Sequence, residues 1–225
     1  SFIGLDSPLT VTQMLWVNLI MDTFAAMALS SLPADRKVLN DKPRRWDSHI
    51  VNSRMLRRIV GVGLIFFIIL AGFWQLLWHT NASSMSELMN PESLKLFFTG
   101  FIDMNHTKAH MSGEDMGLFF TLFVMMQFWN LFNAKYFHTD RSLILDIVDR
   151  FRNPSAVKGS FGRGFIWIAL VILLGQILIV SLAGPAFNVS RLSVSDWLWI
   201  LLLTSPVLVV ADVFRTVRYF FKANR

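Results

Sequence analysis

Five apolar segments, each close to the length that an α-helix needs to cross a bilayer, dominate this chain of 225 residues. A membrane-spanning helix takes about 20 residues. The segments cover residues 14–32, 59–78, 117–134, 164–184 and 196–214. Backbone groups inside a bilayer have to bond within their own segment, so such spans are helical. The sequence therefore predicts an all-α, polytopic transmembrane helical bundle with five spans.

The composition supports this class of protein. Hydrophobic residues make up 54% of the chain, and 21 Phe stand against 2 Tyr, which is too apolar for an ordinary soluble domain. The chain has no cysteine, which excludes disulfides and thiolate metal sites. The net charge of +6 comes without any nucleic-acid motif. We therefore expect the lipid bilayer, and no nucleic acid, as a partner.

The basic residues predict the topology. Of the 21 Lys and Arg residues, 8 lie in residues 33–58, 6 in residues 135–163 and 4 in residues 215–225. Cytoplasmic connections carry an excess of Lys and Arg, so these three segments are predicted to face the cytoplasm. Ser1 would then lie outside without a signal peptide, and we expect an odd number of further spans ahead of it.

The predicted topology divides the chain into five parts, the second of which contains two loops. They are an outer lead-in, three spans that enclose a cytoplasmic loop and a long outer loop, a second cytoplasmic loop, two more spans and a cytoplasmic tail, at residues 1–13, 14–134, 33–58, 79–116, 135–163, 164–214 and 215–225. Residues 93–102 of the outer loop are too few to cross a bilayer and are amphipathic. We expect a peripheral helix there.

The first span carries Asp22 near its centre, with Asn18 one helical turn earlier on the same face. An ionised Asp at mid-membrane costs about 2.5–3.5 kcal/mol, so such residues usually face a partner or an ion. An amide oxygen beside a carboxylate suits calcium, magnesium or a proton, and suits zinc or copper poorly. The structural alternative is an interhelical clamp of hydrogen bonds.

The third span carries Gln127, Asn130 and Asn133 at steps of three residues. Each interhelical hydrogen bond in a membrane contributes about 0.6–2 kcal/mol, which is enough to explain amides on one face. For Gln127, near mid-depth, an ion role and a packing role stay equally open. For Asn130 and Asn133 the pattern favours packing.

Four other polar residues are more easily explained without an ion. We expect Gln176 in the fourth span to be a packing group, and Asp212 near the inner end of the fifth to pair with Arg215 or reach water. His106 and His110 would share a helical face, but nothing else closes a coordination shell around them. We expect both to be solvated loop residues.

Three motifs resemble a known family. Residues 15–23, Leu-Trp-Val-Asn-Leu-Ile-Met-Asp-Thr, are similar to the sixth transmembrane helix of type II P-type calcium ATPases, the plasma-membrane type above all. Residues 123–135 resemble that family's eighth helix, and residues 151–154, Phe-Arg-Asn-Pro, resemble the segment before its ninth. The resemblance implies that the five spans are helices six to ten of a P-type ATPase.

The resemblance also implies a function: an ATP-driven calcium export pump in the plasma membrane. Asn18 and Asp22 stand at positions of calcium ligands in the family, and the carboxylate there also carries countertransported protons. Gln127 stands where pumps with two calcium sites have Glu, and Met21 where they have Thr. A single calcium site, with Asn18, Asp22 and Gln127 as its candidates in this chain, is the expectation.

The family's ATP-consuming parts do not occur in this sequence, which has neither an Asp-Lys-Thr-Gly-Thr nor a Thr-Gly-Glu-Ser motif. ATP and Mg²⁺ are therefore expected only in cytoplasmic domains outside this chain. The remainder of the pump would be its partner, and this chain alone should be inactive as an enzyme. The alternatives are a pump of the same superfamily for another cation, and a non-enzymatic membrane scaffold or channel subunit.

Overall fold

The computed structural model describes residues 7–32, 51–93, 95, 108, 110–137, 142–152 and 163–223. Across these residues the chain is helical and has no strand. Five helices are long and apolar enough to cross a membrane. They are Val11–Ser30, Met55–His79, Gly113–Lys135, Gly164–Leu182 and Val194–Phe221. The predicted fold class is thus confirmed, whereas the peripheral helix predicted at 93–102 falls almost entirely outside the described residues.

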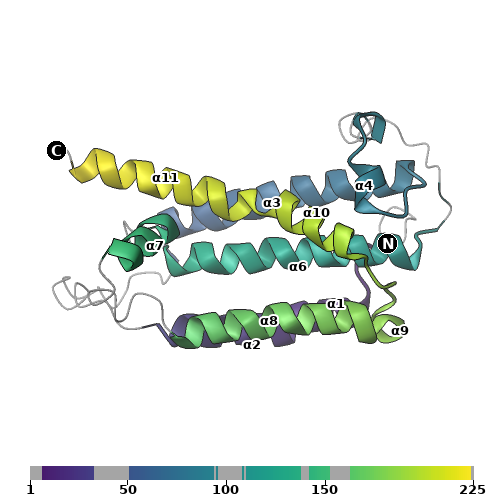
Figure 1. Ribbon diagram of the computed structural model, residues 1–225, viewed down its shortest axis with the longest axis horizontal. Coiled ribbons are helices and arrows are strands. Elements are labelled where there is room, and N and C mark those ends of the chain that lie inside the picture. Colours follow the sequence, from purple (N-terminus) through teal and green to yellow (C-terminus); the bar gives the residue numbers. More distant parts are fainter. Residues whose placement is uncertain are drawn as a thin grey trace.

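The long helices run side by side along the longest axis of the molecule (Figure 1). In chain order the elements are α1 (Val11–Leu15), the π-helix η1 (Trp16–Met21), α2 (Asp22–Ser30), α3 (Ser53–His79), α4 (Met85–Leu88), α6 (Gly113–Lys135), α7 (Leu143–Arg152), α8 (Arg163–Leu182), α9 (Gly184–Phe187), α10 (Val194–Thr204) and α11 (Pro206–Ala223). Helices α4 and α9 lie at one end of the bundle, and α7 and the end of α11 lie at the other.

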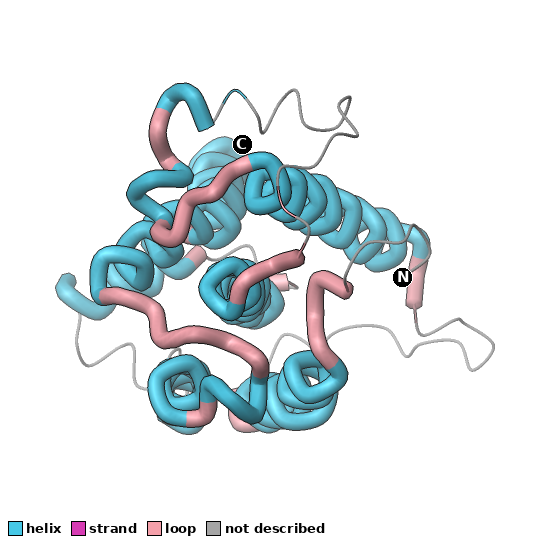
Figure 2. Tube along the Cα trace, turned by 90° about the vertical axis from the view of Figure 1, so that its right-hand side faces the viewer, coloured by secondary structure: helices cyan, strands magenta, loops and turns pink. Residues whose placement is uncertain are grey.

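Helix α6 is the centre of the bundle. Its membrane-spanning window is 72% buried, against 22% to 33% for the other four spans. The view along the bundle shows a helix enclosed by the others (Figure 2), and α6 contacts α2, α3, α8, α10 and α11. Its buried residues, such as Leu118, Phe120 and Met125, occur on every side of the helix. A helix that is apolar all round is typical of such a position.

Helix α8 packs antiparallel against the first span. Near one end Gly164 lies against Ser31, and further along Gly175 lies against the indole of Trp16. A Cβ atom on Gly175 would lie only 2.8 Å from Cη2 of Trp16. The glycine therefore permits the close approach of the two helices, as small residues commonly do in membranes.

The last span is broken near its middle, where α10 ends at Thr204 and α11 begins at Pro206. Proline has no N–H to continue the helical hydrogen bonds, which accounts for the break. Trp129 of α6 donates from Nε1 to Oγ1 of Thr204 at 3.0 Å beside it. The sequence predicts one span over 196–214 and a tail from 215, whereas α11 continues as a helix to Ala223.

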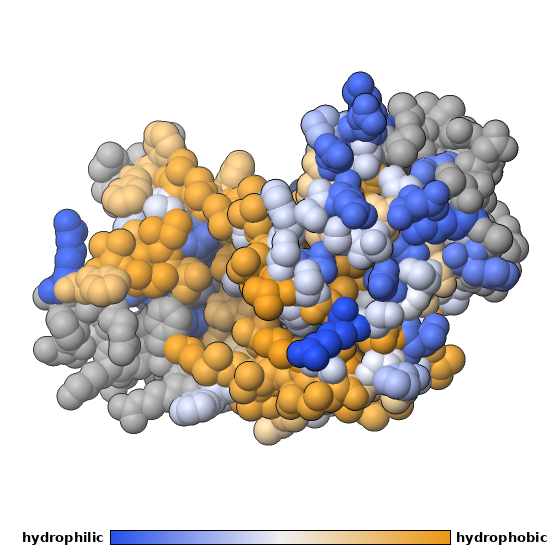
Figure 3. All heavy atoms as spheres, turned by 45° about the vertical axis from the view of Figure 1, so that its right-hand side comes forward, coloured by the Kyte–Doolittle hydropathy of each residue, from blue (hydrophilic) through white to orange (hydrophobic). Residues whose placement is uncertain are grey.

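The surface of the bundle suits a bilayer. Large apolar side chains on different spans are mostly exposed, among them Phe67 at 68%, Leu174 at 57% and Leu202 at 63%. Hydrophobic residues cover the middle of the molecule in the space-filling view, and hydrophilic residues gather toward the end that holds α4 and α9 (Figure 3). So large an apolar surface is incompatible with water and matches membrane-spanning helices.

Candidate cation site

The start of the first span is held in place by two polar residues. Thr10 and Gln13 form a capping box, in which the Thr10 hydroxyl accepts from the Gln13 backbone N–H and the Gln13 side chain accepts from the Thr10 N–H. Gln13 is fully buried, and its Nε2 donates to the Phe187 carbonyl in α9 at 2.8 Å. These bonds fix where the span begins relative to α8 and α9.

The stretch that carries Asn18 and leads into Asp22 is a π-helix over Trp16–Met21. The Asp22 backbone N–H donates to the carbonyl of Val17, five residues earlier. The sequence offers no signal for this widened turn. Single π-turns inside α-helices are rare and are frequent at functional sites.

The two sides of this turn have different surroundings. Val17 and Met21 face the inside of the bundle and are only 6% and 3% exposed, whereas Asn18 and Asp22, which follow them in the sequence, are exposed. Among the described residues, neither polar side chain makes a hydrogen bond or an ion pair. The structure therefore brings Asn18 and Asp22 together on one open face, and they do not serve as a clamp within the described part of the chain.

Gln127 lies on the central helix α6 and is half-buried, between the buried side chains of Met126 and Phe128. No hydrogen bond among the described residues joins it to Asn18 or Asp22. The structure thus does not link Gln127 to the pair on the first span. A contact between Gln127 and an ion remains a prediction.

The packing role expected for Asn133 is confirmed. Asn133 donates from Nδ2 to the carbonyl of Val207 at 2.8 Å, in α11 just after the break that follows α10. The guanidinium of Arg215 in α11 donates to its Oδ1. The half-buried Asn130 has no such bond among the described residues.

Asp212 of α11 is also structural, in a way that the sequence does not reveal. It is only 2% exposed, and its two oxygens accept the backbone N–H groups of Leu143 and Ile144, both at 2.8 Å. These are orphan donors at the start of α7, and a carboxylate there also favours the helix dipole. Arg215 Nη1 lies 3.3 Å from Asp212 Oδ1, which confirms the expected pairing.

Tyr136, just after α6, completes the attachment of α7. Its hydroxyl donates to Oδ2 of the buried Asp146 at 2.9 Å. Burial, followed by the negative charge of Asp146, raises the pKa of Tyr136 well above its usual range, so the phenol keeps its proton. We call the four residues Asp212, Arg215, Tyr136 and Asp146 the α7 clamp. The sequence motifs do not predict this role of Tyr136 and Asp146.

Other buried carboxylates are helix caps, and these do have a sequence signature. Ser112 with Asp115, and Ser193 with Asp196, each form a reciprocal capping box at the start of α6 and of α10. The spacing Ser-x-x-Asp before an apolar run predicts this arrangement. Asp196 also accepts the N–H of Met85 at 2.8 Å and so ties α4 to α10.

The described residues contain no group of three or more His, Cys, Asp or Glu side chains that could hold a metal ion. His106 lies outside the described residues, so the expectation that it is a solvated loop residue stays a prediction. Asn18 and Asp22 together offer at most three oxygens, and calcium takes six to eight. A calcium ion bound at this face would need most of its ligands from elsewhere.

A bundle of membrane helices with a carboxylate at mid-span is typical of proteins that move ions. The family model for the cation transporting ATPase C-terminus matches residues 6–217. The chain therefore belongs to this family, as the C-terminal membrane portion of a P-type ATPase.

The relatives by sequence agree with the family. The chain is 32% identical over 220 residues to plasma membrane calcium-transporting ATPase 3 of Homo sapiens, covering 94% of this chain and 15% of the relative. It is 31% identical over 217 residues to plasma membrane calcium-transporting ATPase 2 of Oreochromis mossambicus, covering 94% and 16%. The chain thus spans about 15% of the length of these relatives, and the resemblance found in its motifs is confirmed.

Proposed function

We propose that the chain is part of the transport domain of an ATP-driven calcium export pump, and that its first span supplies ion ligands from Asn18 and Asp22. One observation carries the proposal: the two oxygen-bearing side chains are exposed, one turn apart, at the middle of a span that packs against the bundle through Val17 and Met21. Unpaired carboxylates at this depth are costly and are retained for a function.

The geometry suggests how the span would act. Val17 and Met21 hold one side of the π-turn against the bundle, so Asn18 and Asp22 project from a supported helix. An amide oxygen and a carboxylate are hard ligands suited to calcium. The remaining ligands would come from upstream helices of the pump. When the cation leaves, Asp22 could take up a proton in its place.

Coupling to ATP would lie outside this chain. In the complete pump, phosphorylation in a cytoplasmic domain would shift the helices between two arrangements, one facing each side of the membrane, with different affinity for the cation. ATP and Mg²⁺ would act in those domains, and the chain alone would be inactive. We place the protein in the plasma membrane with its carboxyl terminus in the cytoplasm, as its basic segments favour.

The rival functions are distinguished by specific features. A scaffold that uses Asn18 and Asp22 as a clamp is disfavoured, since neither side chain is bonded to another described residue. Transport assays on the complete protein would distinguish a calcium pump from a pump for another cation. Gln127 is proposed as a weaker, neutral ligand, so Gln127→Ala should change calcium affinity less than Asn18→Ala does.

The amide ligand gives a matched test. Asn18→Ala in the complete pump should lower the apparent calcium affinity of ATP hydrolysis at least about tenfold, the effect of about 1.4 kcal/mol of lost ligand energy. Asn133→Ala removes an amide of the same type that is bonded inside the bundle, and should leave that affinity within about twofold. Equal calcium affinities for Asn18→Ala and the unchanged pump would contradict the proposal.

A further inference from the structure

Helix α7, Leu143–Arg152, lies in the connection between the third and fourth spans, which the sequence predicts as a basic loop. Ile144, Ile147, Val148 and Phe151 follow one another at helical spacing and are 41%, 41%, 40% and 85% exposed. We call these four residues the α7 stripe. Side chains at positions i, i+3, i+4 and i+7 form one continuous face of a helix, so α7 presents an unbroken apolar surface away from the bundle.

The opposite face of α7 is fixed to the bundle by polar contacts. Asp146 is 1% exposed and accepts from Tyr136, and the first N–H groups of α7 donate to Asp212. Because these bonds are directional and buried, they set how α7 is rotated about its own axis. The α7 clamp thus holds the apolar stripe outward, which is the reverse of what burial of apolar surface favours in water.

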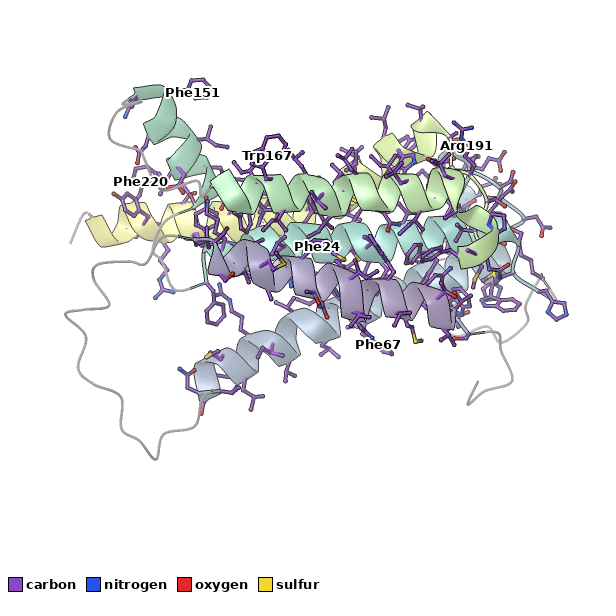
Figure 4. All side chains as sticks on the ribbon, turned by 90° about the horizontal axis from the view of Figure 1, so that it is seen from below. Phe24, Phe67, Phe151, Trp167, Arg191 and Phe220 are labelled. Carbon is purple, nitrogen blue, oxygen red and sulfur yellow. The ribbon has the colours of Figure 1, made fainter. Side chains whose placement is uncertain are left out.

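The position of α7 indicates which environment surrounds the α7 stripe. Helix α6 ends at Lys135 and α8 begins at Arg163, so α7 lies at the level where two spans leave the membrane. In Figure 4, α7 projects sideways from that end of the bundle. Phe151 lies at the tip of α7, on the same side of the bundle as Trp167 of α8. Trp167 is 68% exposed near the start of its span, a typical interfacial position.

We propose that α7 is an interfacial helix whose stripe inserts into the bilayer surface beside the bundle. The stripe is exposed at the same end of the bundle as Trp167 of α8, and a helix of this pattern lies in the membrane plane with its apolar face among the headgroups and upper acyl chains. The exposed Arg152 at the end of α7 suits the anionic headgroups of a cytoplasmic leaflet. α7 therefore anchors the end of the bundle to lipid.

Photo-crosslinking in the complete pump, reconstituted in phosphatidylcholine and phosphatidylserine nanodiscs, tests this. Benzoylphenylalanine is placed at Phe151, with Trp167 as a lipid-facing reference and Glu87, exposed on α4, as a water-facing one. We expect lipid adducts at 151 within about twofold of those at 167 and about tenfold above those at 87. The same probe at Ile147 gives an independent reading on the next turn of the stripe.

Mass spectrometry of the adducts decides the outcome. Lipid adducts at both stripe positions support the proposal. Adducts to a peptide from another part of the pump or from another protein would show that the stripe is a protein docking face, and would overturn it. A lipid yield at 151 and 147 no higher than at 87, with normal yield at 167, would also overturn it.

Discussion

The central helix α6 and the first span carry similar polar residues in opposite circumstances. The window of α6 is 72% buried and that of the first span 22%. On α6, Asn133 has its amide bonded to α11 on both sides. On the first span, Asn18 and Asp22 are exposed and unbonded among the described residues.

The contrast separates two uses of polarity in a membrane protein. A polar side chain that finds its partner inside the bundle stabilises the packing, and its loss should reduce stability. One held on an open face, on a helix supported from behind, adds little to the stability of this chain and is available to an ion. The predictions below test this distinction, beginning with the largest expected effect.

Asp212→Ala should be the most destabilising of these substitutions. It removes the acceptor of two N–H groups of α7 and leaves Arg215 without its carboxylate in a buried place. Breaking a buried ion pair by removing one partner costs about 3–5 kcal/mol. A large fall in the thermal unfolding temperature in nanodiscs is expected. A change of less than a degree or two would mean that the α7 clamp is not structural.

Gly175→Ala should cost about 1–3 kcal/mol, as overpacking commonly does. The added Cβ would lie 2.8 Å from the Trp16 ring and would force apart α8 and the π-turn. Gly61→Ala in α3 is the control, because nothing lies within 4 Å of a Cβ built there. Thermal unfolding of both variants checks this; equal midpoints would show that the contact between Gly175 and Trp16 is not tight.

Asn133→Ala should cost about 0.6–2 kcal/mol for each interhelical hydrogen bond that it removes. Two such bonds are lost, the one to the Val207 carbonyl and the one from the guanidinium of Arg215. Asn130→Ala, three residues earlier, removes an amide without such a bond and should cost less. Thermal unfolding compares the stability of the two variants. A larger loss of stability for Asn130→Ala than for Asn133→Ala would contradict the packing role of Asn133.

Tyr136→Phe should cost about 1 kcal/mol near neutral pH for each of the two hydrogen bonds that it removes, the one donated to Asp146 and the one accepted from Nζ of Lys135. The raised pKa of Tyr136 also makes the stability of the protein depend on pH. The unfolded phenol loses its proton near pH 10 while the folded one keeps it, so this stabilisation is full below about pH 10 and falls as pH rises above it. The Phe variant should lack that alkaline decline.

Much of the fold was predictable, because a bilayer imposes its thickness on any helix that crosses it. Five apolar runs of spanning length predict five spans, and all five are present. The break at Pro206 and the helix α7 were missed. The run 196–214 stays apolar through the proline, so hydropathy hides the break, and α7 lies in a connection whose basic residues favour a cytoplasmic loop.

The candidate site was predictable only in part. That Asn18 and Asp22 share a face follows from their spacing, since residues four apart lie one turn apart on a helix. Which side of the helix is open depends on how the neighbouring helices pack against it, and periodicity in the first span predicts neither that side nor the π-helix. The roles of Asp146 and Asp212 depend on partners 10 or more residues away.

The most direct test of the account compares two carboxylates of the same chain. Asp22→Asn and Asp212→Asn are introduced separately into the complete pump, and each is measured for thermal stability and for calcium-dependent phosphorylation by ATP. We predict a crossed result: Asp22→Asn abolishes calcium-dependent phosphorylation at unchanged stability, and Asp212→Asn lowers stability while the remaining folded protein keeps its calcium dependence. Wild-type calcium dependence in Asp22→Asn would contradict the account.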